Sequence, residues 1–244
     1  MRAAWSEGLA AGLERLLLPN SCVVCDRLAP TRVPDTLLCG VCRSRLQSLA
    51  PGCERCGQPL PPVGPCRFCA EWPPVLASAR SAVWLSHEAR TLVHHLKYDD
   101  YPILAETVAD IIQSRMTRPA GVLVAIPMGP RKLRMRGYNQ AVLIAAALGR
   151  RWNLPVRNDL LERPQDGHTQ TTLTPEARLA NVATVFRAGR RVPPAEVILV
   201  DDVLTTGATL RAAAEALGRA KVERISAVTF ARALPYEIRS LPYR

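Results

Sequence analysis

Residues 197–210 have the sequence VILVDDVLTTGATL, in which four apolar residues run directly into two adjacent aspartates. The apolar run is short, β-branched and bounded by polar residues, so it predicts a buried strand. From residue 207 to 218, apolar residues recur at helical spacing, with an Arg–Glu pair four residues apart on the other side. The order is therefore strand, loop, helix, and the loop lies at the carboxyl end of the strand, where open α/β sheets bind ligands.

The composition of this loop favours a phosphate. Its backbone N–H groups would point into a concave turn at a helix N-terminus, and three threonine hydroxyls add donors. Asp201 and Asp202 fit beside an anion if they accept hydrogen bonds from nearby sugar hydroxyls, and a phosphorylated ribose supplies both groups. The residues expected to bind the phosphate are Thr205, Thr206, Gly207, Ala208 and Thr209.

An ideal strand would point Asp201 and Asp202 to opposite faces, so we expect the chain to be turning already at these residues. The alternative interpretation is a buried strand followed by an ordinary capped helix, with Asp202 or Thr206 as the cap. A cap does not need two aspartates, three threonines and a glycine in this order. The run resembles the phosphoribosyl diphosphate (PRPP) motif of type I phosphoribosyltransferases, with Asp201 and Asp202 as the candidate catalytic residues.

All eight cysteines lie between positions 22 and 69, in four Cys-x-x-Cys pairs. A two-residue spacer puts both sulfurs on one side of a tight turn, which suits half of a tetrahedral Zn²⁺ site. Four pairs make two closed Cys₄ sites, which are structural because they keep no position open for water. The expected ligands are Cys22, Cys25, Cys39, Cys42, Cys53, Cys56, Cys66 and Cys69.

Disulfides and an iron–sulfur cluster are the competing interpretations of the cysteines, and neither explains four repeated pairs. The segment has little apolar material and many prolines, so we expect it to need metal in order to fold. The spacing leaves open which pairs share an ion. Sequential pairing would give two ribbons in tandem and interleaved pairing a cross-braced unit, and we favour sequential pairing.

The charge of the chain is unevenly distributed. The formal net charge is +11, and residues 127–163 alone contain eight Lys or Arg against two acidic residues. Thiolates bound to zinc would make the cysteine-rich segment slightly acidic. We therefore expect the cationic surface on the rest of the chain, where it favours phosphate-rich partners.

Composition divides the chain into four segments. We expect a lead-in helix over residues 1–18, a double zinc ribbon over 19–72, an α/β domain over 75–234 and a tail over 235–244. The first segment lacks a clean apolar core and a small-residue cleavage site, which argues against a signal peptide. No stretch approaches the roughly 20 apolar residues of a spanning helix. We therefore expect a cytoplasmic protein without a membrane span, in which the thiols stay reduced.

Apolar patterning predicts the other elements of the α/β domain. We expect strands at 77–85, 121–126 and 222–230, and helices at 88–97, 103–116 and 141–151. A Gly-containing turn with several cations precedes the last of these helices. Arg131 and Arg136 there suit a diphosphate, since a guanidinium pairs bidentately with phosphate oxygens. The alternative is a solvated basic loop. Lys97 could also reach a diphosphate, although a solvent-facing lysine is the simpler interpretation.

The remaining polar residues are less informative. His94 and His95 are more typical of packing or surface positions than of a catalytic pair. The polar segment at 161–182 lacks periodicity, and residues 169–178 could close over a bound ligand. Tyr138 and Trp152 are the aromatic residues expected near the basic stretch. So few aromatics favour sequence-tolerant contacts with a nucleic-acid backbone over base stacking.

Together these features resemble the ComF family of competence and DNA-utilisation proteins, over residues from about 19 to 232. Trp84, where tyrosine is expected, is a minor departure. The resemblance implies a type I phosphoribosyltransferase-like α/β domain with a Rossmann-like parallel sheet, joined to an N-terminal double zinc ribbon. The resemblance rests on the four cysteine pairs, the Asp201-Asp202 run, His95-Leu96-Lys97-Tyr98, Ile126-Pro127, Arg131, Arg136-Gly137-Tyr138-Asn139-Gln140-Ala141, Arg163, Thr169-Gln170, Arg178 and Asn181-Val182.

The resemblance implies a role in handling incoming single-stranded DNA during natural transformation. The first hypothesis is therefore a DNA-processing factor that binds Mg²⁺–PRPP and single-stranded DNA, with other DNA-uptake or recombination proteins as partners. The second is a metabolic phosphoribosyltransferase acting on an unidentified nucleobase-like acceptor. We find no hood that would recognise such a base, and a zinc module stands in its place. The third is a regulator that uses PRPP only as an effector.

Overall fold

The computed structural model describes residues 21–27, 37–59, 64–164, 185–191 and 193–233. Its centre is a four-stranded parallel sheet in the order β1-β6-β5-β2. The strands are β1 (Leu76–Trp84), β2 (Val122–Ala125), β5 (Glu196–Leu204) and β6 (Arg224–Arg232). The carboxyl ends of all four strands therefore meet at one edge of the sheet, as the α/β prediction requires.

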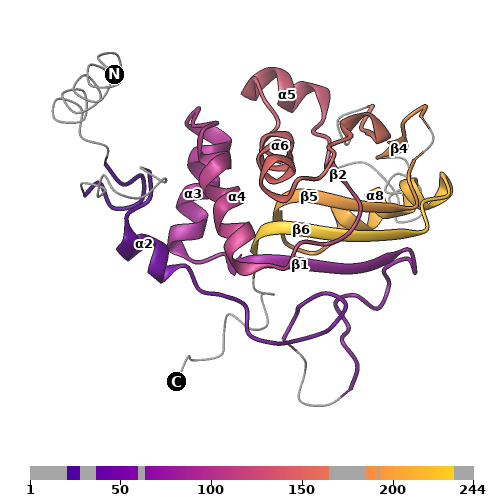
Figure 1. The fold of residues 1–244 in the computed structure, drawn as a ribbon, viewed down its shortest axis with the longest axis horizontal. Helices are drawn as coiled ribbons and strands as arrows, with labels where there is room; N and C mark the ends of the chain where they lie inside the picture. Colours follow the sequence, from indigo (N-terminus) through magenta and orange to yellow (C-terminus); the bar gives the residue numbers. More distant parts are fainter. Residues whose placement is uncertain (1–20, 28–36, 60–63, 165–184, 192, 234–244) are drawn as a thin grey trace, which may run out of the picture.

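Helices cover both faces of the sheet (Figure 1). On one face pack α3 (His87–Tyr98), α4 (Leu104–Arg115) and α6 (Gln140–Trp152), and on the other packs α8 (Ala208–Arg219). Each face has its own buried apolar cluster, because alternate residues of the buried strands point to opposite sides. The strands and helices expected from apolar patterning are confirmed, with bounds shifted by at most two residues, except that the strand predicted from residues 197–200 continues to Leu204.

The basic turn expected before α6 is partly helical, which corrects the prediction. Helix α5 (Pro130–Arg136) begins with a proline in its first turn and ends at Gly137, whose φ of 80° places it in the left-handed region. The N–H of Gly137 donates to the carbonyl of Leu133 at 2.8 Å. Charge and exposure conceal this helix in the sequence, since none of its residues is buried.

Short elements complete the described part of the chain. These are α2 (Gly40–Arg45), the 3₁₀ turn η1 (Asn158–Leu160), and the antiparallel pair β3 (Leu161–Glu162) and β4 (Arg187–Ala188). Within the described ranges, every helix is too short or too polar to cross a lipid bilayer. The expected lead-in helix, tail and closing loop at 169–178 lie outside the described residues.

The two cysteine clusters lie on opposite sides of the sheet. Cysteines of the first cluster join the apolar core beneath α3, α4 and α6, whereas those of the second join the core beneath α8. Between them the chain runs along the free edge of β1, where Ala79 donates to the carbonyl of Arg55 (2.8 Å) and Trp84 to that of Gln47 (2.9 Å). The zinc module thereby covers an edge strand that would otherwise expose unpaired N–H groups.

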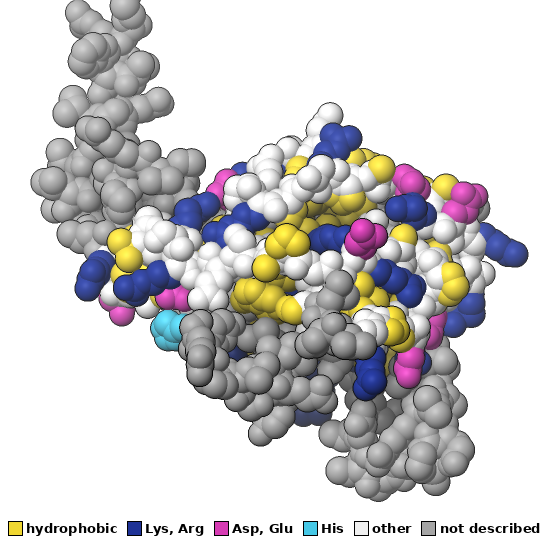
Figure 2. Space-filling model, turned by 90° about the horizontal axis from the view of Figure 1, so that it is seen from below, with side chains coloured by type: hydrophobic (Ala, Val, Ile, Leu, Met, Phe, Trp, Pro, Cys, Tyr) yellow, Lys and Arg dark blue, Asp and Glu magenta, His cyan; other side chains and the backbone are white. Residues whose placement is uncertain are grey.

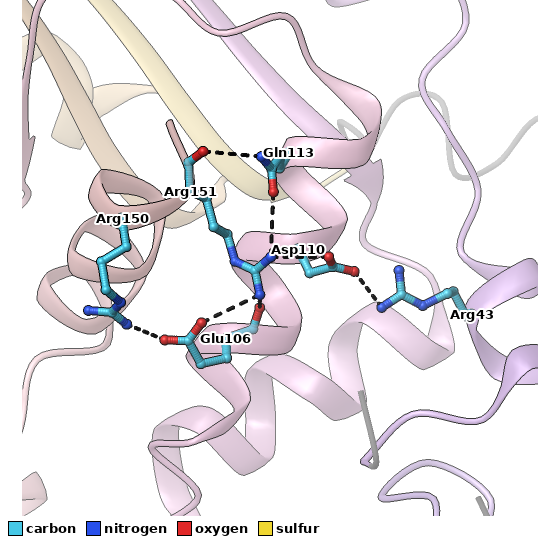
Figure 3. Close-up of polar contacts among 6 residues, drawn as sticks. All are labelled: Arg43, Glu106, Asp110, Gln113, Arg150 and Arg151. Carbon is cyan, nitrogen blue, oxygen red and sulfur yellow. Dashed lines mark hydrogen bonds and ion pairs between the residues drawn. The ribbon is translucent and has the colours of Figure 1, made fainter. Parts of the chain in front are cut away.

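An ion-pair network fastens the first ribbon to the helices (Figure 3). Arg43 of α2 contacts Asp110 of α4 at 2.7 Å, and Asp110 contacts Arg151 of α6 at 3.2 Å. Glu106 of α4 pairs with both Arg150 and Arg151. Two of the arginines in the basic stretch are therefore neutralised by acids outside it.

Candidate functional site

Strand β5 carries the two adjacent aspartates without turning, which corrects the sequence interpretation. The strand stays extended to Leu204, and Asp201 pairs in register with Thr229 of β6. Asp202 is 4% exposed and points to the face covered by α3, where its Oδ2 lies 2.9 Å from Nζ of Lys97. Both aspartates are regular residues of the strand, so their side chains lie in different surroundings.

The carboxyl of Asp201 has a raised pKa in the folded chain. Its Oδ1 accepts a hydrogen bond from the N–H of Asp202 at 2.9 Å. Burial, and then the neighbouring charge of Asp202, raise the pKa of Asp201 to about 8. The folded chain therefore holds the proton of Asp201 to a higher pH than the unfolded chain does.

The loop after β5 has the geometry expected of an anion site. Gly207 occupies the left-handed region at φ 79° and is the N-cap of α8, so the cap residue has no side chain to offer, and the N–H of Ala208 donates to Oγ1 of Thr206 at 3.4 Å. The side chains of Thr205, Thr206 and Thr209 are exposed. The N-terminus of α8 therefore presents backbone donors beside three hydroxyls, and an external anion can cap it.

The ends of β2 and α3 form the neighbouring wall of the site. Asn139, the N-cap of α6, donates from its side chain to the carbonyl of Ile126 at 2.9 Å, and the Tyr138 hydroxyl donates to the carbonyl of Leu96 at 2.9 Å. The guanidinium of Arg136 lies 5.1 Å from the centroid of the Tyr98 ring. These contacts place Arg136 beside the residue that follows Lys97.

The structure thus brings together Lys97, Asp202 and the β5–α8 loop, with Arg136 close by. Arg131 lies exposed at the start of α5, at the opposite end of that helix from Arg136. Lys97 is held by a buried carboxylate, so the simpler interpretation of a solvent-facing lysine is wrong. Its side chain remains 22% exposed, which leaves it accessible to a ligand.

An exposed surface that is both cationic and apolar adjoins this site, and we call it the α5 surface. Its apolar members are Tyr98 (67% exposed), Tyr101 (43%), Ile103 (62%), Leu133 (41%) and Met135 (78%). Its exposed cations are Arg131, Lys132 and Arg134 of α5. On the opposite face of the molecule, cations, acids and apolar side chains are interspersed (Figure 2).

The aromatic residues expected near the basic stretch are not the ones on this surface. Trp152 is 5% exposed and packs in the core, and the Tyr138 hydroxyl donates a hydrogen bond to the carbonyl of Leu96. Tyr98 and Tyr101 take their place, from the turn between α3 and α4. Only the fold places that turn against α5, so local sequence could not assign them, although Tyr98 follows Lys97 directly.

The cysteines form two clusters with the sequential pairing that we favoured. One contains Cys22, Cys25, Cys39 and Cys42, and the other Cys53, Cys56, Cys66 and Cys69, with the ligand atoms of each cluster within 4.8 Å of one another. A tetrahedral ion with Zn–S bonds of about 2.3 Å puts its sulfurs about 3.8 Å apart. Observed separations of 3.8 Å (Cys25–Cys39), 3.7 Å (Cys53–Cys69) and 3.6 Å (Cys56–Cys66) fit that geometry.

The two histidines have packing and surface roles, as predicted. The Nε2 of His95 lies 2.9 Å from the carbonyl oxygen of Val23 in the first zinc knuckle, and its Nδ1 lies 2.7 Å from Asp99. His94 is exposed and also contacts Asp99. His95 therefore ties the first ribbon to the end of α3.

Comparisons with known proteins agree with both parts of this structure. The phosphoribosyl transferase domain family matches residues 139–241, and the double zinc ribbon domain family matches residues 13–70. DNA utilization protein YhgH of Salmonella typhimurium is 27% identical over 213 residues, spanning 84% of this chain and 93% of the relative. The resemblance to the ComF family is confirmed.

Two further ComF-like relatives cover most of the chain. Competence protein F of Haemophilus influenzae is 27% identical over 211 residues, which span 80% of this chain and 90% of that protein. Competence protein ComFC of Bacillus subtilis is 25% identical over 248 residues, spanning 93% and 99%. The similarity to proteins named for competence and DNA utilisation therefore extends over most of this chain.

Proposed function

We propose that this chain binds Mg²⁺–PRPP at the carboxyl end of β5. The observation that carries the proposal is the ion pair between Lys97 and Asp202, 2.9 Å apart, beside the N-terminus of α8, whose N-cap residue is a glycine. A buried carboxylate, an accessible ammonium and a hydroxyl-rich loop at a helix N-terminus match the three parts of PRPP, which are a diol, a diphosphate and a 5′-phosphate.

Each part of the ligand has a partner of suitable chemistry. The 5′-phosphate accepts hydrogen bonds from the backbone and hydroxyls of residues 205–209. Asp202, together with the preceding Asp201, accepts hydrogen bonds from the ribose hydroxyls. Lys97 and Arg136, with Arg131 from the other end of α5, offset the charge of the diphosphate, and Mg²⁺ accompanies that group.

We further propose that single-stranded DNA binds the α5 surface, next to the PRPP site. This proposal rests on the stacking of Arg136 over Tyr98, since exposed aromatic rings bordered by cations bind bases and phosphates together. Relatives named for competence and DNA utilisation support a role in the uptake and processing of DNA during natural transformation. The site is then cytoplasmic and works with other DNA-uptake or recombination proteins.

The alternative proposal is transfer of the ribose 5-phosphate of PRPP to a nucleobase-like acceptor. The bond from the anomeric carbon to the diphosphate oxygen would break, the acceptor nitrogen would form the new bond, and diphosphate and a proton would leave. Lys97 and Arg136 could stabilise the leaving diphosphate. Release of diphosphate in the presence of candidate bases supports this alternative, and its absence across them excludes it.

Binding of a fluorescent single-stranded oligonucleotide, titrated across salt with and without Mg²⁺–PRPP, tests the DNA proposal. We expect salt-dependent binding that PRPP changes, because the two ligands occupy adjoining surfaces. A duplex of the same sequence is the control. No binding at low salt would contradict the proposal.

A further inference from the structure

The indole of Trp72 packs against the glycine of the proposed phosphate loop. An ideal Cβ built on Gly207 would lie 3.0–3.3 Å from three indole atoms of Trp72, which is 5% exposed. Trp72 lies three residues after Cys69, the last cysteine of the second cluster, and the backbone N–H of Trp72 donates to the carbonyl of Cys69 at 3.2 Å. The left-handed turn at Gly207 is therefore formed beneath a side chain that the second ribbon holds.

The second ribbon fixes this tryptophan from several directions. Phe68 packs edge-on against the indole, with the ring centroids 5.8 Å apart. Arg55 donates to the carbonyls of Cys69 and Trp72, both at 3.0 Å, and its guanidinium lies 5.9 Å from the indole centroid. One residue before Trp72, Glu71 pairs with Arg211 in the first turn of α8 at 2.8 Å. The second ribbon thus contacts both the loop glycine and the helix that follows it.

A buried arginine connects the same ribbon to the end of the sheet. Arg232 is 0% exposed, donates to the carbonyl of Cys56 (2.6 Å) and to Oε1 of Gln58 (2.9 and 2.7 Å), and lies 4.4 Å from the Phe68 ring centroid. Four thiolates and one Zn²⁺ have a net negative charge, which offsets the buried guanidinium. Arg232 pairs in register with Leu204, the last residue before the loop.

We infer that the second zinc ribbon holds the phosphate loop in its binding conformation, with Trp72 as a positioning residue. This inference rests on the proposed PRPP site. Metal in the second cluster then sets the affinity for the phosphorylated ligand. The first ribbon lies on the other face of the sheet and contacts α3 and α4 through His95 and Arg43, so it supplies a matched control.

Hydrogen–deuterium exchange of the full-length, zinc-loaded protein tests the inference without any ligand. In Trp72→Ala, the amides of residues 203–210 should exchange about tenfold faster, because the loop loses its packing partner. Trp72→Phe keeps an aromatic ring and should remain close to wild type. Arg43→Gln, which loosens the first ribbon, should leave this loop unchanged. Equal exchange in wild type and Trp72→Ala overturns the inference.

Affinity for Mg²⁺–PRPP provides the second readout. We expect about tenfold weaker binding for Trp72→Ala and recovery in Trp72→Phe. If wild type and Trp72→Ala bind PRPP equally, the inference fails while the proposed function stands. If wild type binds no PRPP but the exchange of the loop still depends on Trp72, the proposed function fails and the structural coupling stands.

Gly207→Ala keeps the inference testable if Trp72→Ala loses its zinc. The added methyl group must displace the indole, so the fluorescence emission of Trp72 should change. The contribution of Trp72 is obtained by subtracting the spectrum of Gly207→Ala/Trp72→Phe from that of Gly207→Ala, and it is compared with the same difference between wild type and Trp72→Phe. Unchanged emission means that the indole does not rest on the loop, which overturns the inference.

Discussion

Among single residues, the proposed site depends most on the ion pair between Lys97 and Asp202. Asp202 is almost fully buried, and the ammonium of Lys97 at 2.9 Å is its charged partner. Such a pair contributes little net stability when intact, but removing one member leaves a buried charge uncompensated. The same arrangement places a cation where a diphosphate can reach it.

Lys97→Met and Asp202→Asn should therefore differ in their effect on folding. Lys97→Met leaves the Asp202 carboxylate unpaired, so we expect it to lower the free energy of unfolding by about 2–3 kcal/mol. Asp202→Asn leaves no buried charge, and a loss of about 1 kcal/mol is expected. Urea denaturation measures both. A smaller loss for Lys97→Met than for Asp202→Asn would contradict the pairing.

Asp201 gives stability a defined pH dependence. Its pKa is raised from 3.8 to about 8 by burial and by Asp202, so the folded chain retains a proton that the unfolded chain has released. The stabilisation is complete below the lower value and is lost as pH rises toward the higher one. Asp201→Asn should remove this decline, so the variant should gain stability over wild type between about pH 5 and about pH 8. Parallel pH profiles of the two proteins would contradict the assignment.

Among the secondary-structure elements, helix α5 is the one on which the proposed DNA-binding surface depends. None of its residues is buried, it begins at a proline and is followed by a left-handed glycine, and it presents cations and apolar side chains beside Tyr98. Periodicity predicted the buried helices well, because their apolar stripes face the sheet. It could not find α5, whose pattern lacks a buried stripe, nor the pairing of Tyr98 with Arg136, which depends on the turn between α3 and α4.

Substitutions on the α5 surface should separate stacking from phosphate contacts. Tyr98→Ala is expected to weaken binding of a single-stranded oligonucleotide by about 1–3 kcal/mol, whereas Tyr98→Phe keeps the ring and most of the affinity. Arg134→Gln should instead lower the slope of log affinity against log salt by about one. Fluorescence anisotropy measures both. Equal affinities for Tyr98→Ala and Tyr98→Phe would exclude stacking.

At the scale of the whole molecule, the two zinc ribbons pack against opposite faces of the central sheet. Cysteine spacing alone predicted the ligands, because each knuckle is a local structure, but it left open which pairs share an ion, and the fold shows the sequential pairing that we favoured. Sequence could not show that the clusters lie on opposite faces of the sheet, since that depends on the path of the chain along the edge of β1. The contact of Trp72 with Gly207 joins residues far apart in the chain and has no local signal.

Single cysteine variants should separate the two metal sites. Cys25→Ser and Cys66→Ser remove matched, partly buried ligands from the first and second clusters, and each should lower the zinc content from two ions to one. Because structural zinc is linked to folding, each variant should also have a lower melting temperature. Elemental analysis of the purified protein checks the stoichiometry. Two ions retained in either variant would overturn the ligand assignment.

Calorimetric titration of Mg²⁺–PRPP into the wild-type protein and into Asp201→Asn/Asp202→Asn is the measurement that tests the phosphoribosyl site most directly. Circular dichroism and zinc content establish that the double variant is folded. We expect saturable binding to wild type, and no detectable binding to the folded double variant, because the ribose hydroxyls lose their carboxylate acceptors. Equal binding by the two proteins would contradict the assignment of the ribose to these aspartates, and no binding to wild type would contradict the site itself.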